Sequence, residues 1–202
     1  MFLRDRGPTE VGAFGITRPD DLLLVEEIQL VHQRCTETFV AFDDAAVAEH
    51  FEHQVESGRR PEQFGRIWIH THPGESAQPS RVDVETFHRV FGRCDWAVMF
   101  ILAQGGQTYA ELSWRHGGPA SIRLGVKVDF SHPFSGSNQD QWEHEYHTHV
   151  DPHAFQDPRL MDFEDDWMYL SPLGHDLDIS STPRRQPHEW QDDHELQEPA
   201  PF

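Results

Sequence analysis

Two histidines and an aspartate in this chain have the spacing of metal ligands. His70 and His72 stand in the short apolar segment 66–72 (RIWIHTH), and Asp83 follows further along. Alternate side chains of a β-strand point to the same face, so both imidazoles would share one face. Asp83 falls in the first turn of a helix that we expect to begin at Ser80, from which it can reach the same ion. Two nitrogens, one carboxylate and a fourth position open to water describe a catalytic zinc site.

The elements that must position these residues alternate between strands and helices. The apolar patterns predict strands at 9–17, 22–31, 36–42, 66–72, 96–103, 107–114 and 120–129. They predict two helices, one from Asp43 or Asp44 to about Ser57 and one over 80–93. The apolar sides of these helices would be Ala46, Val47, Phe51 and Val55 in the first and Val84, Phe87, Val90 and Phe91 in the second. We therefore predict an α/β (α+β layered) fold with a mixed, partly antiparallel sheet flanked by helices.

The order HxH, seven residues, Ser, two residues, Asp resembles the JAMM signature of the MPN+ (JAB domain) zinc metalloprotease family. His70, His72, Ser80 and Asp83 match its four positions. The family also has a glutamate in an early strand, and Glu10 in TEVGAFG fits that place. The resemblance covers about residues 5–130 and implies a cytidine-deaminase-like JAB/MPN fold for a domain at 1–130.

The resemblance also implies a role for each matched residue. His70, His72 and Asp83 would bind one zinc ion per chain, and Glu10 would act as general base and then general acid. Ser80 would donate a hydrogen bond to the developing oxyanion. The implied activity is that of the prokaryotic, deubiquitinase-like isopeptidases, which hydrolyse the bond after the C-terminal glycine of a ubiquitin-like modifier. The partner would then be a ubiquitin-like protein or its conjugates.

Other interpretations of the same residues stay open. The site could process a sulfur-carrier protein or hydrolyse a small-molecule amide, and a non-catalytic MPN scaffold is a further alternative. Ser80 and Asp83 also form an S-x-x-D capping pattern. Glu26 and Glu27 compete with Glu10 because they too lie in a predicted strand. Trp68 shares the parity of the histidines, so it would line a substrate groove or, more commonly, pack in the core.

Charge and composition exclude several classes of partner. The formal net charge is −19, which disfavours nucleic acid and anionic membrane surfaces. No apolar run approaches the ~20 residues that span a bilayer, and the start of the chain has no signal-peptide pattern, so we expect a cytoplasmic protein. Cys35 and Cys94 are expected to be buried free thiols.

The acidity is concentrated in residues 131–202, which carry 16 acidic against 3 basic side chains. We expect this acidic, His-rich segment to be an extension with one or two short helices and a disordered end after about residue 180. It would pack over the cleft or present a docking surface. Its ligand-rich stretch, with His144, His147 and His153, is either polar helix surface or a second metal site.

Overall fold

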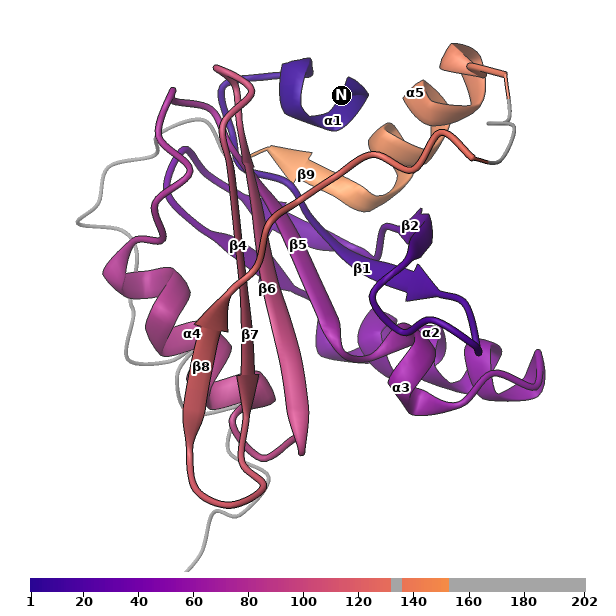
Figure 1. The fold of residues 1–202 in the computed structure, drawn as a ribbon. Helices are drawn as coiled ribbons and strands as arrows, with labels where there is room; N and C mark the ends of the chain where they lie inside the picture. The colour runs from indigo at the N-terminus through magenta and orange to yellow at the C-terminus, as the bar shows by residue number, and fades with distance from the viewer. Residues whose placement is uncertain (132–135, 153–202) are drawn as a thin grey trace, which may run out of the picture. The chain divides into compact units, whose positions relative to one another are not determined.

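A six-stranded mixed sheet forms the centre of the fold (Figure 1). Its strand order is β2 (Val25–Gln29), β1 (Gly12–Thr17), β5 (Ile67–His72), β6 (Trp96–Ala103), β7 (Thr108–Trp114) and β8 (Ala120–Arg123). Strands β5 and β6 are parallel, and the other neighbouring pairs are antiparallel. The structure, a computed structural model, describes residues 1–131 and 136–152. The predicted mixed sheet with flanking helices is confirmed.

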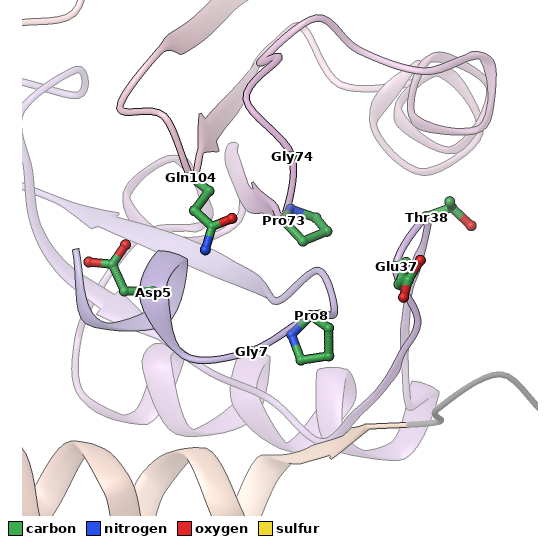
Figure 2. A pocket seen from close by; sticks show the side chains of 8 residues that line it. All are labelled: Asp5, Gly7, Pro8, Glu37, Thr38, Pro73, Gly74 and Gln104. Atoms are coloured by element: carbon green, nitrogen blue, oxygen red, sulfur yellow. The ribbon is translucent and has the colours of Figure 1, made fainter.

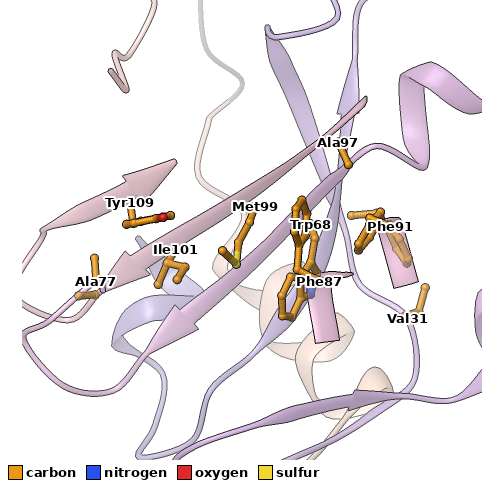
Figure 3. Packing of buried hydrophobic residues seen from close by; sticks show 11 residues of the cluster. Val31, Trp68, Ala77, Phe87, Phe91, Ala97, Met99, Ile101 and Tyr109 are labelled. Carbon is orange, nitrogen blue, oxygen red and sulfur yellow. The ribbon is translucent and has the colours of Figure 1, made fainter. Parts of the chain in front are cut away.

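Helices cover both faces of this sheet because successive strand residues point to opposite sides. On one face, Phe14 of β1 and Trp68 of β5 belong to a core cluster that includes Phe87 of α4 (Arg81–Phe91) (Figure 3) and that is covered by Phe51 of α2 (Asp44–Glu56). On the other face, a second cluster includes Tyr146 of α5 (Gln139–His149) and is flanked by α1 (Phe2–Asp5). The short α3 (Pro61–Phe64) precedes β5. Helix α4 is the crossover that two parallel neighbours, β5 and β6, require.

A second, three-stranded sheet joins distant parts of the sequence. Its order is β4 (Val40–Phe42), β3 (Gln33–Cys35) and β9 (Val150–Pro152), and β9 runs parallel to β3. We expected the extension to begin at residue 131. Residues 139–152 form α5 and β9. They belong to the compact unit Met1–Pro158. The expected disordered end after about 180 lies outside the described residues.

Several predicted elements differ from those observed. The segment 36–42 is not one strand, because the Thr38 amide donates to the Thr36 hydroxyl (3.2 Å) and forms a turn before β4. The strand predicted at 120–129 ends at Arg123: the Leu124 amide still donates to the Ala110 carbonyl of β7 (2.9 Å), and residues 125–129 are exposed and belong to no strand. Val55, Val84 and Val90 are exposed, so the apolar sides of α2 and α4 are narrower than expected.

A hairpin over 104–106 joins β6 and β7, the strands predicted at 96–103 and 107–114, with Gly106 at a positive φ of 83°. No helix in the two described ranges is long and apolar enough to cross a membrane.

Candidate metal centre

Three elements converge on a buried group of four ligand-type side chains. Glu10 precedes β1, His70 and His72 belong to β5, and Asp83 lies in the first turn of α4. One nitrogen or oxygen atom from each side chain lies within 4.8 Å of the others. The exposed fractions are 4% for Glu10, 0% for His70, 9% for His72 and 3% for Asp83. The sequence predicted these four residues, and the fold brings all of them together.

The capping pattern at the start of α4 places Asp83. The Ser80 amide donates to Asp83 Oδ2 (2.7 Å), and the Asp83 amide donates to the Ser80 hydroxyl (3.1 Å), which is a capping box. This box uses the second carboxylate oxygen and leaves Oδ1 directed at His70 Nε2, 3.3 Å away. The capping and ligand interpretations of Asp83 are therefore compatible, because the cap orients the carboxylate.

Packing and hydrogen bonding orient the two imidazoles. Trp68 stacks on His70 with ring centroids 4.3 Å apart, so Trp68 supports a ligand from within the core and does not line a groove. His72 Nδ1 lies 2.9 Å from the Ser76 carbonyl oxygen, which can only accept, so Nδ1 carries the hydrogen. The lone pair of His72 is consequently on Nε2, which faces Asp83 and Glu10 at 3.4 and 3.7 Å. Such outer hydrogen bonds are what fixes the tautomer of a metal-binding histidine.

The spacing and the unpaired atoms of this group fit a small divalent cation. Tetrahedral zinc has bonds of about 2.0–2.1 Å, which puts neighbouring ligand atoms about 3.3 Å apart. The contacts of Asp83 with His70 and His72, at 3.3 and 3.4 Å, match that separation. Within the described residues, His70 Nε2, His72 Nε2 and Glu10 Oε2 are buried and have no hydrogen-bond partner. Buried polar atoms without partners are costly, and a shared cation would satisfy the two imidazole nitrogens.

In the metal-free site, burial and the contacts among these side chains set the protonation states of His70, His72 and Asp83. Burial lowers the pKa of His70, so this imidazole is neutral. Burial acts to lower the pKa of His72 as well, but contacts with Asp83 and the Ser76 carbonyl outweigh it and raise the pKa. Burial acts to raise the pKa of Asp83, yet its histidine contacts hold it well below the usual range. In the metal-free site, the ionised Asp83 therefore favours the protonated form of His72.

Glu10 has the most unusual protonation state. Burial, followed by repulsion from the Asp83 carboxylate, raises its pKa from 4.5 to about 8, while the nearby His72 acts to lower it. A carboxyl group whose pKa lies near neutrality can both accept and release a proton under physiological conditions. In the metal-free site Glu10 is therefore a carboxyl group that can exchange a proton.

A pocket of about 570 Å³ is lined partly by residues that adjoin the centre in the sequence, and none of the four clustered side chains lines it (Figure 2). Gly7 and Pro8 come from the segment that leads to Glu10, and Pro73 and Gly74 directly follow His72. Figure 2 shows Pro8 and Pro73 facing each other across the pocket, with Gln104 and Glu37 also at its wall. The glycines and prolines contribute little bulk to the wall, and the remaining lining residues, Asp5, Glu37, Thr38 and Gln104, are polar or acidic.

Other candidates from the sequence are placed elsewhere. Glu26 and Glu27 are exposed on β2 beside Arg18 and Arg59, which leaves Glu10 as the glutamate of the centre. Ser80 is exposed at the start of α4. Burial raises the pKa of the free thiol of Cys35 to about 12, which disfavours a nucleophilic role, and the free thiol of Cys94 is half-buried.

The histidine-rich stretch gives no second centre in the part of the chain that the structure describes. His147 contacts Arg6 and Glu143, and His149 Nδ1 lies 2.9 Å from the Glu145 carbonyl within α5. Across residues 1–131 and 136–152, the group around Asp83 is the only cluster of at least three such side chains placed to hold a metal. His153 lies outside the described residues.

Two buried polar residues near this centre, Gln33 and Thr71, could not be recognised from the sequence. For Thr71, what was missed is its hydrogen bonding. Gln33 has an exposed fraction of 0%, but a lone glutamine in a short strand carries no pattern that predicts burial.

Comparison with models of protein families gives no match, and a search of curated proteins finds no significant relative. The geometry of the buried Glu10, His70, His72 and Asp83 group is therefore the basis for assigning a function.

Proposed function

We propose that this chain is a zinc-dependent peptidase or isopeptidase that hydrolyses the bond after the C-terminal glycine of a ubiquitin-like protein. The observation that carries this proposal is the convergence of two imidazoles, an aspartate and a glutamate with a raised pKa in one buried group. Three ligands with a separate acid–base carboxyl group are the set that a hydrolytic zinc site requires. The resemblance of HxH-x7-S-x2-D to the JAMM signature supplies the substrate class.

Each side chain has a distinct role in the proposed reaction. His70, His72 and Asp83 would hold the zinc ion, which when bound activates water and polarises the scissile carbonyl. Glu10 would accept the proton that the attacking water gives up and deliver it to the leaving amine. The hydroxyl of Ser80 accepts the Asp83 amide, so its own proton remains available for the oxyanion.

The pocket that includes Pro73 and Gly74, which directly follow His72, is where we place the C-terminal tail of the substrate. Its walls include Gly7, Pro8, Pro73 and Gly74, which contribute little side-chain bulk. An extended tail of glycines would lie along this wall. Processing of a sulfur-carrier protein would use the same residues and the same pocket.

The experiment is a cleavage assay on a panel of ubiquitin-like fusions with zinc supplied. We expect wild type to cleave after the terminal glycine and Glu10→Gln to retain about one zinc ion per chain while turnover falls at least ~100-fold. Glu26→Gln is the matched control, since Glu26 is exposed on the neighbouring strand β2. His72→Ala should lose most of the zinc.

Two results would contradict parts of the proposal. Full activity of Glu10→Gln would mean that the base is another group. A zinc-loaded wild type that cleaves no fusion would refute the modifier substrate and favour hydrolysis of a small-molecule amide at the same centre.

A further inference from the structure

The segment that carries Glu10 is held by an alternating series of hydrogen bonds. The amide of Glu10 donates to the Thr36 carbonyl (2.8 Å), that of Val11 to the Thr71 hydroxyl (3.0 Å), and that of Gly12 to the Gln33 side-chain oxygen (2.7 Å). Successive amides of a strand point to opposite sides, so these acceptors lie alternately on the two edges of the segment. Two of the three acceptors are side-chain atoms.

Thr71 ties this segment directly to the histidine strand. It stands between His70 and His72, so its side chain points away from the centre and toward Val11. Its hydroxyl accepts the Val11 amide, and its own amide donates to the Val11 carbonyl (3.0 Å). One residue therefore holds both polar groups of the residue that follows Glu10, and it is itself buried.

Gln33 performs the same task on the other edge. Pairing between β1 and β2 begins at Phe14, opposite Gln29, so no strand of the large sheet reaches Gly12 on that side. The carboxamide of Gln33 occupies the place of a strand there. Besides accepting the Gly12 amide, its nitrogen donates to the carbonyl oxygens of Gly12 and Val31, each at 2.9 Å.

We propose that Thr71 and Gln33 are positioning residues that hold the Glu10 carboxyl group against the histidine pair. Glu10 Oε1 lies 3.7 Å from His72 Nε2, and a shift of about 1 Å in such a group can lower turnover ~100-fold. The hydroxyl and the carboxamide replace backbone partners, so removing either one leaves a buried amide without an acceptor. The catalytic consequence rests on the proposed hydrolase function, whereas the structural claim does not.

The structural claim is tested by amide hydrogen exchange in the full chain. Thr71→Val removes the acceptor and keeps the shape, and Thr71→Ser keeps the oxygen. We expect the Val11 amide to exchange at least tenfold faster in Thr71→Val and at the wild-type rate in Thr71→Ser. Thr17→Val is the matched control, since the Thr17 hydroxyl is also buried and donates to the Gln63 carbonyl at the far end of β1. Unchanged exchange at Val11 in a folded Thr71→Val protein would overturn the proposal.

Gln33→Met provides a second variant in case Thr71→Val fails to fold. Its shape is similar and it cannot bond Gly12, so we expect faster exchange at the Gly12 amide. Both variants should retain about one zinc ion, and the visible spectrum of the Co²⁺-substituted protein should not change, because the ligands stay in place. Loss of metal in either variant would show that the residue acts on the ligands and would overturn the proposal.

A double-mutant cycle tests whether the effect passes through Glu10. We expect Thr71→Val to lower kcat about tenfold with KM unchanged, and to have no further effect in the Glu10→Gln background. An equal loss in both backgrounds would contradict positioning of Glu10. A wild type that binds zinc but cleaves no fusion would refute the proposed function, and exchange at Val11 and Gly12 would still decide the positioning claim.

Discussion

Replacing Glu10 by glutamine is expected to stabilise the metal-free protein, and the gain should depend on pH. In the folded protein the pKa of Glu10 is raised from 4.5 to about 8, mainly by burial. The folded state therefore keeps a proton that the unfolded state releases near pH 4.5. As pH rises between these values, ionisation in the unfolded state draws the equilibrium away from the folded protein. Glutamine is neutral at every pH and removes this effect.

The magnitude follows from the size of the shift. Each unit of difference in pKa corresponds to about 1.4 kcal/mol. At pH 7 the folded Glu10 is still mostly protonated, so the difference accumulates over about 2.5 pH units. We therefore expect Glu10→Gln to raise the free energy of unfolding by about 3 kcal/mol at pH 7 and to have almost no effect below pH 4.5.

Urea denaturation of metal-free wild type and variant between pH 4 and pH 8 measures this difference. Glu26→Gln, on exposed β2, is the control and should change the stability by less than about 0.5 kcal/mol at every pH. A difference for Glu10→Gln that is constant with pH, or of the opposite sign above pH 6, would refute the assigned burial of an acid–base carboxyl group. The expected result would show that this position is kept for chemistry at the expense of stability.

Three further outcomes are expected. The affinity for zinc should increase as pH rises, because the pKa of His72 is raised and its proton must leave before Nε2 can bind metal. Chelator competition measures this affinity, and an affinity independent of pH would contradict the raised pKa of His72. Ser80→Ala should cost about 1 kcal/mol in denaturation because α4 loses its N-cap, whereas Ser80→Thr should cost less. Gly12→Ala should destabilise by about 1–3 kcal/mol, since a Cβ there would lie 2.6 Å from Phe42 Cε1, while Gly74→Ala, which has open space, is the control; equal stability of the two glycine variants would argue against the close packing at Gly12.

The candidate metal ligands were predictable because their relation is local in sequence. The alternation of strand side chains placed His70 and His72 on one face, and the capping pattern placed Asp83 in the first turn of α4. The distance between the histidine pair and Asp83 depends on the one loop that joins β5 to α4. Their proximity could therefore be predicted without the rest of the chain. Both local rules hold in the structure.

The choice of Glu10 over Glu26 and Glu27 was not local. All three lie in segments with strand-like patterns, and only the sheet order, which puts β1 next to β5 and β2 at the edge, separates a buried glutamate from two exposed ones. Sheet order depends on pairing between residues far apart in the chain. The resemblance to the JAMM signature pointed to Glu10, and the fold supplies the physical reason.

The sequence by itself therefore determined the candidate ligand set, the face that carries it and the helix start that orients Asp83, because each follows from backbone periodicity and the capping pattern. Only the tertiary structure decided the burial of Gln33, the pairing of β9 with β3 and the bonds that hold the segment before β1. These contacts join residues about 20 to 120 positions apart, such as Gly12 with Gln33, Val11 with Thr71 and Gln33 with Val150. Periodicity carries no information at that range, since it reports which face a residue occupies and not what that face meets.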